Sequence, residues 1–274
     1  MGNNISTTNF SKPFPWINFL TIIGFAFLYA PIIILMIYSF NSSKLVTVWA
    51  GFSTHWYYAL WSDEELMSAV GISLKIAASS ASIAVLIGTL AGVVLARFGL
   101  FFGRSLFSGL LSSPFVMPEV VTGFSMLLLF VSAEQLIGWP SGRGINTIII
   151  THTTLGIAYV AVLVQARLSS FDKSLEEAAL DLGARPLKVF MVITIPLIMP
   201  SLIAGWLLSF TLSLDDLVLA SFTSGPGSTT LPMLIYSRVR LGVSPEINAL
   251  ATIIVVAVAI AATLTGLLVF KGKK

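Results

Sequence analysis

Apolar runs of about 20 residues recur along this chain, and they constrain its fold more than any other feature. A run of that length can cross a bilayer as an α-helix, in which each backbone N–H and C=O group finds its partner within the segment. Hydrophobic residues make up 56% of the 274 residues and charged residues only 10%, whereas a soluble domain carries roughly 25% charged residues. The sequence therefore predicts an all-α, polytopic membrane protein.

We expect six transmembrane helices within one membrane domain covering residues 16–270. The predicted spans lie at about residues 16–40, 67–95, 105–131, 145–164, 197–221 and 248–270. The first apolar run is longer than a signal-peptide core and has no convincing small-residue cleavage site, so we interpret it as a retained span. Residues 1–15 and 271–274 are expected to form short polar tails.

The distribution of basic residues predicts the orientation of these spans. Six spans place both termini on one side, together with Lys12, Arg97, Arg104, Arg167, Lys173, Arg185, Lys188, Lys271, Lys273 and Lys274. The other side carries Lys44, Arg143, Arg238 and Arg240. Cytoplasmic loops are enriched in lysine and arginine, so both termini are expected in the cytoplasm. The pI of 9.2 reflects these loops and predicts no nucleic-acid partner; the absence of cysteine excludes disulfides and thiolate metal sites.

The longest polar interruption on the predicted cytoplasmic side covers residues 167–196. Ser174 and Glu177 have the spacing of a capping box, in which two side chains satisfy free amides at a helix start. Gly183 can adopt the left-handed conformation that ends a helix, and Pro186 suits the first turn of the next one. This pattern predicts a helix, a sharp turn and a second helix lying at the membrane surface.

The same segment resembles the EAA loop, E-A-A-x3-G-x9-I-x-x-P, of the membrane subunits of bacterial ABC importers. The matching residues are Glu177, Ala178, Ala179, Gly183, Ile193 and Pro196. The resemblance implies a type I (MetI-like) permease fold, in which this loop is the coupling helix that sits in a groove of a cytoplasmic ATPase. It implies no cofactor in this chain, because ATP and Mg²⁺ bind the partner ATPase. The chain has no Walker A sequence, so we expect a transport subunit and not an enzyme.

Ionisable residues in or near the predicted spans are candidates for a solute pathway, because such groups are costly in a membrane. The acids are Glu119, Asp215 and Asp216, and Lys75 lies in the second span. At about 1.5 Å per residue, the two aspartates lie near the outer end of span five. They could face a pathway, be hydrated at the interface, or pair with Lys75. His152 is expected to be a hydrogen-bonded interior residue, and no metal site is predicted.

Carboxylates without metal-ligating histidines suit an organic cation held by ion pairs and hydrogen bonds. Residues 41–44, 51–57, 213–216, 221–226 and 230–232 look like the polyamine branch of these permeases. That resemblance implies an importer of putrescine first and spermidine next, working by alternating access. The implied partners are a homologous second permease in a heterodimer, two ATPase subunits, a periplasmic polyamine-binding protein and membrane lipid.

Two alternative functions stay open at this point. The chain could be a permease for another cationic or metal solute such as ferric iron, although the shortage of histidine and lack of cysteine disfavour it. It could also be an ion-coupled secondary transporter whose acids bind a cation or proton. The sequence shows no clear internal repeat, which disfavours transporters built from inverted repeats.

Overall fold

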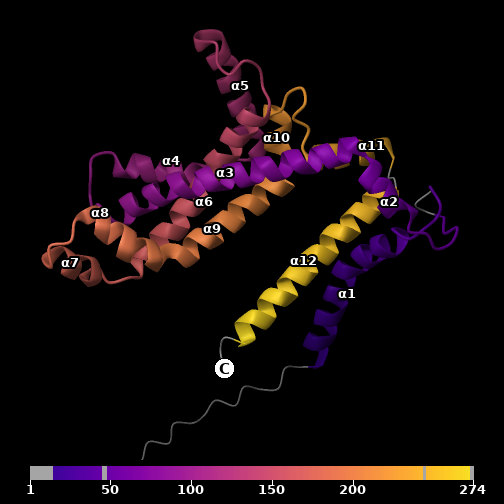
Figure 1. Ribbon diagram of the computed structural model, residues 1–274, viewed down its shortest axis with the longest axis horizontal. Coiled ribbons are helices and arrows are strands. Elements are labelled where there is room, and N and C mark those ends of the chain that lie inside the picture. Colours follow the sequence, from indigo (N-terminus) through magenta and orange to yellow (C-terminus); the bar gives the residue numbers. More distant parts are fainter. Residues whose placement is uncertain (1–14, 45–47, 243–244, 272–274) are drawn as a thin grey trace, which may run out of the picture. The chain divides into compact units, whose positions relative to one another are not determined.

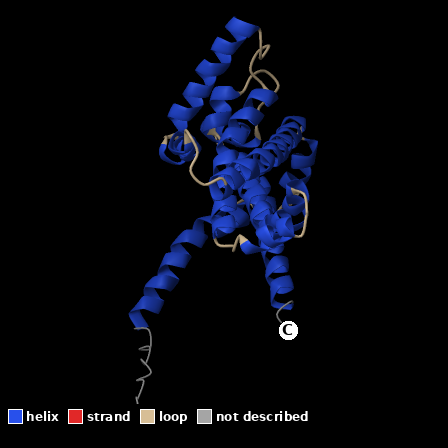
Figure 2. Ribbon diagram, turned by 90° about the vertical axis from the view of Figure 1, so that its left-hand side faces the viewer, coloured by secondary structure: helices blue, strands red, loops and turns tan. Residues whose placement is uncertain are grey.

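A computed structural model describes residues 15–44, 48–242 and 245–271. Every regular element longer than a single β-bridge in these ranges is helical (Figure 2), as the apolar runs predict. The predicted polar tails lie outside these ranges, apart from Pro15 and Lys271. The chain divides into two compact units, residues 1–63 with 239–274, and residues 64–238.

The first unit contains α1 (Pro15–Tyr38), α2 (His55–Ser62) and α12 (Pro245–Lys271), with α12 in contact with both other helices. Apolar side chains are exposed along most of α1, as expected for a helix that faces lipid. The connection between α1 and α2 is held by buried Asn41, whose amide donates to the carbonyl of Val48 at 2.7 Å. The indole of Trp56 donates to the carbonyl of Asn41 at 2.6 Å, which fixes α2 at the end of this loop.

The second unit is built on three long helices that pack side by side, α3 (Glu64–Arg97), α6 (Ile145–Ser169) and α9 (Ile195–Asp215) (Figure 1). Its remaining elements are α4 (Arg104–Val116), α5 (Glu119–Ile137), α7 (Ser174–Asp181), α8 (Pro186–Val189), the π-helix η1 (Phe190–Thr194) and α10 (Val218–Thr223). The helix α11 (Leu231–Leu241) begins in this unit. The core of the bundle includes the fully buried residues Val160, Val164, Leu168 and Ile198.

Small residues allow α3 and α6 to approach closely. A Cβ atom at Gly92 would lie 2.7 Å from the carbonyl oxygen of Ala161, and one at Gly88 would lie 2.7 Å from the Cβ of Val160. Interfaces between membrane helices favour such residues because association there depends on close packing. The α3–α6 pair is therefore a rigid part of the unit.

Five helical segments of the described residues are long and apolar enough to cross a membrane. They are Trp16–Tyr38, Glu64–Arg97, Glu119–Ile137, Ile145–Ser169 and Pro186–Asp215. Four of them coincide with predicted spans one, two, four and five, and the fifth overlaps span three. The sixth predicted span corresponds to α12, so the count of six stays a prediction.

The expectation that span three is one continuous helix is wrong. The helix α4 ends at Val116, and α5 begins at Glu119. Met117 between them has an extended backbone (φ −79°, ψ 133°), because the ring of Pro118 disfavours helical geometry in the preceding residue. Span five also ends earlier than predicted, since Asp216 is extended (ψ 123°) and the chain re-enters a helix only at α10. Both breaks place an acidic residue at a helix end.

Candidate functional site

The surface loop between α6 and α9 has the predicted helix–turn–helix form. Gly183 adopts the left-handed conformation (φ +82°), and its N–H donates to the carbonyl of Leu180 at 2.9 Å. The N–H of Ala184 donates to the carbonyl of Ala179 at 3.1 Å, which completes a Schellman motif. Pro186 occupies the first turn of α8. The turn therefore depends on a glycine at position 183.

The predicted capping box at Ser174 and Glu177 is wrong. The helix α7 begins at Ser174 itself, and the carboxylate of Asp172 accepts the N–H of Ser174 at 3.0 Å. Asp172 lies two residues before Ser174, and its side chain caps the helix start through a local turn that short acidic side chains favour. Hydrogen bonds from the backbone and hydroxyl of Ser174 hold the pKa of Asp172 below its ordinary value of 3.8.

Glu176 attaches α7 to the helical bundle. One oxygen of its carboxylate, Oε2, lies 2.9 Å from Nε of Arg97, the last residue of α3. Nε is not aligned for a hydrogen bond, so this contact is an ion pair. The other oxygen, Oε1, accepts the hydroxyl of Thr194 in η1 at 2.8 Å. Arg97 also donates to the carbonyl of Leu168 at the end of α6, at 3.2 Å.

Glu176 was missed as an attachment point by reasoning from sequence, which assigned importance to its neighbour Glu177. In the structure the side chain of Glu177 is exposed on α7. The remaining predicted coupling residues are divided between the loop surface and its attachment to α9: Ala178 (exposed), Ala179 (half-buried), Gly183 (exposed), Ile193 (half-buried) and Pro196 (exposed). The loop also exposes four leucines, Leu175, Leu180, Leu182 and Leu187.

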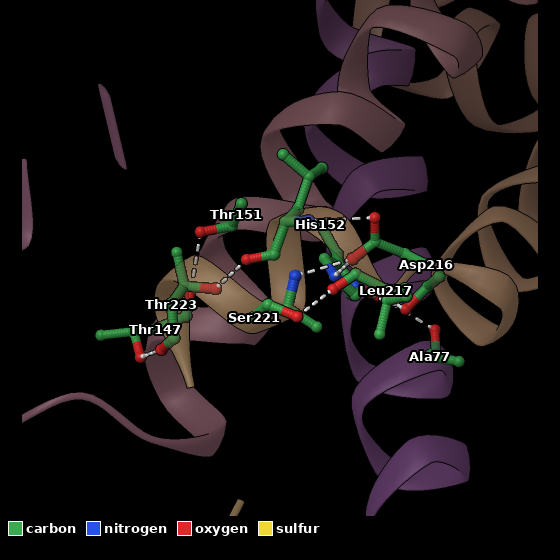
Figure 3. Close-up of polar contacts among 12 residues, drawn as sticks. Ala77, Thr147, Thr151, His152, Asp216, Leu217, Ser221 and Thr223 are labelled. Atoms are coloured by element: carbon green, nitrogen blue, oxygen red, sulfur yellow. Dashed lines mark hydrogen bonds and ion pairs between the residues drawn. The ribbon is translucent and has the colours of Figure 1, made fainter. Parts of the chain in front are cut away.

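A polar cluster lies inside the bundle near the start of α6 and the end of α9 (Figure 3). Nδ1 of His152 lies 2.6 Å from Oγ of Ser213, and Nε2 lies 3.0 Å from Oδ2 of Asp216. The carboxylate of Asp216 also accepts the backbone N–H groups of Leu219 at 3.2 Å and Ala220 at 2.7 Å. Asp216 therefore caps the start of α10, and His152 is the hydrogen-bonded interior residue that the sequence predicts.

The direction of the hydrogen bonds in this cluster follows from the chemistry of its members. An ionised carboxylate only accepts, so Nε2 of His152 carries the hydrogen directed at Asp216. In the neutral tautomer that carries this hydrogen, Nδ1 is the acceptor and Ser213 is its donor. The hydroxyl of Ser80 on α3 lies 3.4 Å from that of Ser213, at the limit of a hydrogen bond. The cluster thus connects α3, α6, α9 and α10.

A small cavity borders this cluster, lined by His152, Ser209, Ser213 and Asp216 together with neighbouring apolar residues. Oγ of Ser209 is buried and has no hydrogen-bond partner among the described residues. Buried polar groups of this kind are usually completed by an ordered water or another small donor.

The predicted pathway acids differ in their exposure. Asp216 is largely buried in the cluster, whereas adjacent Asp215 is exposed at the end of α9. Glu119 is exposed at the start of α5. Lys75 is exposed and forms no ion pair within the described ranges, so the alternative that it pairs with an aspartate has no support.

Five helical segments long and apolar enough to cross a membrane, together with a capped surface loop and buried polar groups, are typical of the membrane subunit of a transporter. Residues 85–270 match the family described as "Binding-protein-dependent transport system inner membrane component". The chain belongs to this family, and it is accordingly a multi-pass permease subunit of an ABC importer in the inner membrane, distinct from the ATPase.

Two named relatives align with most of the chain. The putrescine transport system permease protein PotI of Escherichia coli (strain K12) is 59% identical over 260 residues, which cover 95% of this chain and 92% of that protein. The spermidine/putrescine transport system permease protein PotC of the same strain is 44% identical over 238 residues, or 87% of each chain.

Solved structures of low sequence identity share the fold. A bacterial ABC transporter that imports the acidic polysaccharide alginate has a TM-score of 0.71 at 17% identity, covering 92% of this chain and 94% of its own. The inward-facing MetNI methionine ABC transporter has a TM-score of 0.57 at 18% identity, covering 76% of this chain and 96% of its own. These similarities confirm the predicted MetI-like permease fold.

Proposed function

We propose that this permease carries putrescine into the cytoplasm by alternating access, with spermidine as the next candidate. The observation that carries this proposal is the 59% identity, over 95% of the chain, with a relative named as a putrescine permease. The relative named for spermidine and putrescine is less similar, at 44%. The exposed acids agree with a cationic solute, because carboxylates attract alkylammonium groups and oppose anions.

The coupling surface of the proposed importer is the loop that contains α7 and α8. Its four exposed leucines are apolar side chains that another protein could cover. An ATPase groove is the proposed partner, with Glu177, Ala178, Ala179, Gly183, Ile193 and Pro196 as the coupling residues. Two ATPase subunits would bind ATP and Mg²⁺, and their closure would displace the loop as a rigid body.

Asp215 is the proposed solute-binding carboxylate at the outer end of α9, with Glu119 as a second acid. Asp216 is less suited to this role, because three protein donors already occupy its oxygens. A solute ammonium group would have to displace one of them, which costs the free energy of a buried hydrogen bond. Asp215 is exposed and can accept without such a loss.

The remaining parts of the proposed importer follow from its family and its charge distribution. The excess of basic residues on one side supports cytoplasmic termini and a cytoplasmic coupling loop. A homologous second permease and a periplasmic polyamine-binding protein would complete the assembly. One solved relative, a bacterial alginate ABC transporter, was crystallised in complex with an alginate pentasaccharide-bound periplasmic protein.

Uptake of labelled putrescine and spermidine tests the function directly. Cells that lack their own polyamine importers would express the complete partner set with or without this chain, and an ATPase-inactive partner set would serve as control. We expect putrescine uptake that requires both this chain and ATP hydrolysis. Uptake that continues with the inactive ATPase would point to a secondary transporter, and an assembled complex that binds ATP but moves neither polyamine would refute the assignment of the solute.

A further inference from the structure

We infer that His152 is a positioning residue for transport, because it holds Asp216 on the start of α10 and leaves Asp215 as the exposed acid. This inference rests on the proposed function, in which Asp215 meets the solute. His152 itself lies inside the bundle, where its side chain is only 3% exposed. It would therefore act through the aspartate and not by touching the solute.

The backbone at the end of α9 allows Asp216 to turn inward while Asp215 stays outside. Asp215 is the last residue of α9, whereas Asp216 has an extended backbone that turns the chain toward α10. The carboxylate of Asp216 faces the first turn of α10, which follows it in the chain, and the N–H groups of Leu219 and Ala220 donate to it. Leu219 and Ala220 are at most 1% exposed, so these amides have no access to water as an alternative acceptor.

His152 attaches Asp216 to a different helix, which the two amides of α10 cannot do. Leu219 and Ala220 belong to α10 and would move together with Asp216. His152 belongs to α6, which packs closely on α3, so its bond to Asp216 ties the α9–α10 corner to the rigid part of the bundle. At the other end of α10, Thr147 of α6 donates to the carbonyl of Thr223 at 2.7 Å. The helix α6 therefore holds α10 at both ends (Figure 3).

Both nitrogens of the imidazole are engaged, and this fixes the ring. Ser213 contacts Nδ1 while Nε2 faces Asp216, so rotation of the ring would break two hydrogen bonds inside the bundle. If the histidine donor were removed, Asp216 would lose one of its three donors in a site that is 9% exposed. The carboxylate could then turn toward the exposed side beside Asp215, and a second acid there would retain a cationic solute.

Two amide substitutions separate this role from simple space filling. The side-chain nitrogen of glutamine in His152→Gln can reach the position of Nε2 and donate to Asp216. Asparagine in His152→Asn ends near Nδ1 and can contact only Ser213. Both variants are polar and neither titrates, so they differ mainly in whether Asp216 keeps its donor. The complete importer, reconstituted in proteoliposomes with its binding protein, is the sample for both measurements.

The first measurement is hydrogen exchange of the amides of α10, and the second is putrescine uptake. Loss of one buried, charge-assisted hydrogen bond predicts exchange at least about tenfold faster at Leu219 and Ala220 in His152→Asn. We also expect a maximal uptake rate lower by about tenfold, with an unchanged KM because the binding protein captures the solute. His152→Gln should stay within about threefold of the unmodified protein in both measurements.

Double variants show whether His152 acts through Asp216. When Asp216→Asn is also present, His152→Asn and His152→Gln should give the same uptake, because the carboxylate that the histidine holds is already absent. Normal uptake by His152→Asn, or loss of uptake in His152→Gln with α10 still protected, would overturn the inference. Failure of the proposed pathway would look different: Asp215→Asn would then transport normally, while the exchange of α10 would still report whether His152 holds Asp216.

Discussion

Replacing Glu176 by glutamine should weaken the attachment of the coupling loop to the helical bundle. The Arg97 and Glu176 side chains are only 12% and 16% exposed, and the nearest charged atoms are 2.9 Å apart. Exposed ion pairs contribute about 0–1 kcal/mol, whereas breaking a fully buried ion pair by removing one partner costs about 3–5 kcal/mol. Glu176→Gln keeps an acceptor for Thr194 but loses this mostly buried ion pair, so we expect a cost between these limits, about 2 kcal/mol.

That free energy corresponds to a roughly 30-fold smaller population of loops attached to α3. The assay is the number of putrescine molecules transported per ATP hydrolysed by the complete importer in proteoliposomes. We expect ATP hydrolysis to continue in Glu176→Gln while transport per ATP falls several-fold. Asp181→Asn is the matched control, because Asp181 is an exposed acid at the other end of the same helix.

A double-mutant cycle with Arg97→Gln tests the physical cause. If the ion pair is responsible, the two substitutions share one loss, and the double variant should couple about as well as either single variant. Transport per ATP that matches the unmodified importer in Glu176→Gln would refute the reasoning. Strictly additive losses in the double variant would refute it as well, since they would show that the two residues act separately.

Three further predictions concern Gly183, Gly92 and the two aspartates at the end of α9. Gly183→Val should leave membrane insertion intact but abolish ATP-dependent uptake, because a β-branched residue is strained at φ +82°; normal uptake would contradict this. Gly92→Ala should lower the free energy of unfolding by about 1–3 kcal/mol, since its Cβ would meet the backbone of α6, whereas Gly71→Ala, which faces open space, should have little effect in thermal melts. Asp215→Asn should reduce putrescine flux with complex assembly unchanged, while Asp216→Asn should also speed amide exchange in α10; equal behaviour of both variants would disprove their separate roles.

Features that depend on a few neighbouring residues could be predicted from the sequence. Gly183 and Pro186 specify the turn of the coupling loop, because each has a backbone preference that acts locally. The lengths of α1 and α6 follow from the thickness of the bilayer. The break between α4 and α5 had a local signal too, since the residue before Pro118 is disfavoured in a helix.

Features that depend on distant partners could not be predicted. His152 could be assigned to the interior. Its contact with Asp216, however, joins residues 64 positions apart, and no local sequence pattern predicts that contact. The two adjacent aspartates look equivalent in sequence. They differ in the structure because the extended backbone of Asp216 gives its carboxylate access to the start of α10. Glu176 has the same ambiguity beside Glu177, and the positions of Arg97 and Thr194 distinguish them.

The helix α9 connects the two regions to which the proposed mechanism assigns coupling and solute binding. Its start follows η1, where Thr194 is bonded to Glu176 of the proposed coupling loop, and its end carries Asp215, roughly 30 Å away at 1.5 Å per residue. Because α9 packs on α3 and α6, and Asp216 is bonded to His152 of α6, the end of α9 cannot shift alone without breaking buried hydrogen bonds. A displacement of the loop should therefore move the acidic end together with the whole bundle, and this is the rigid-body motion that alternating access needs.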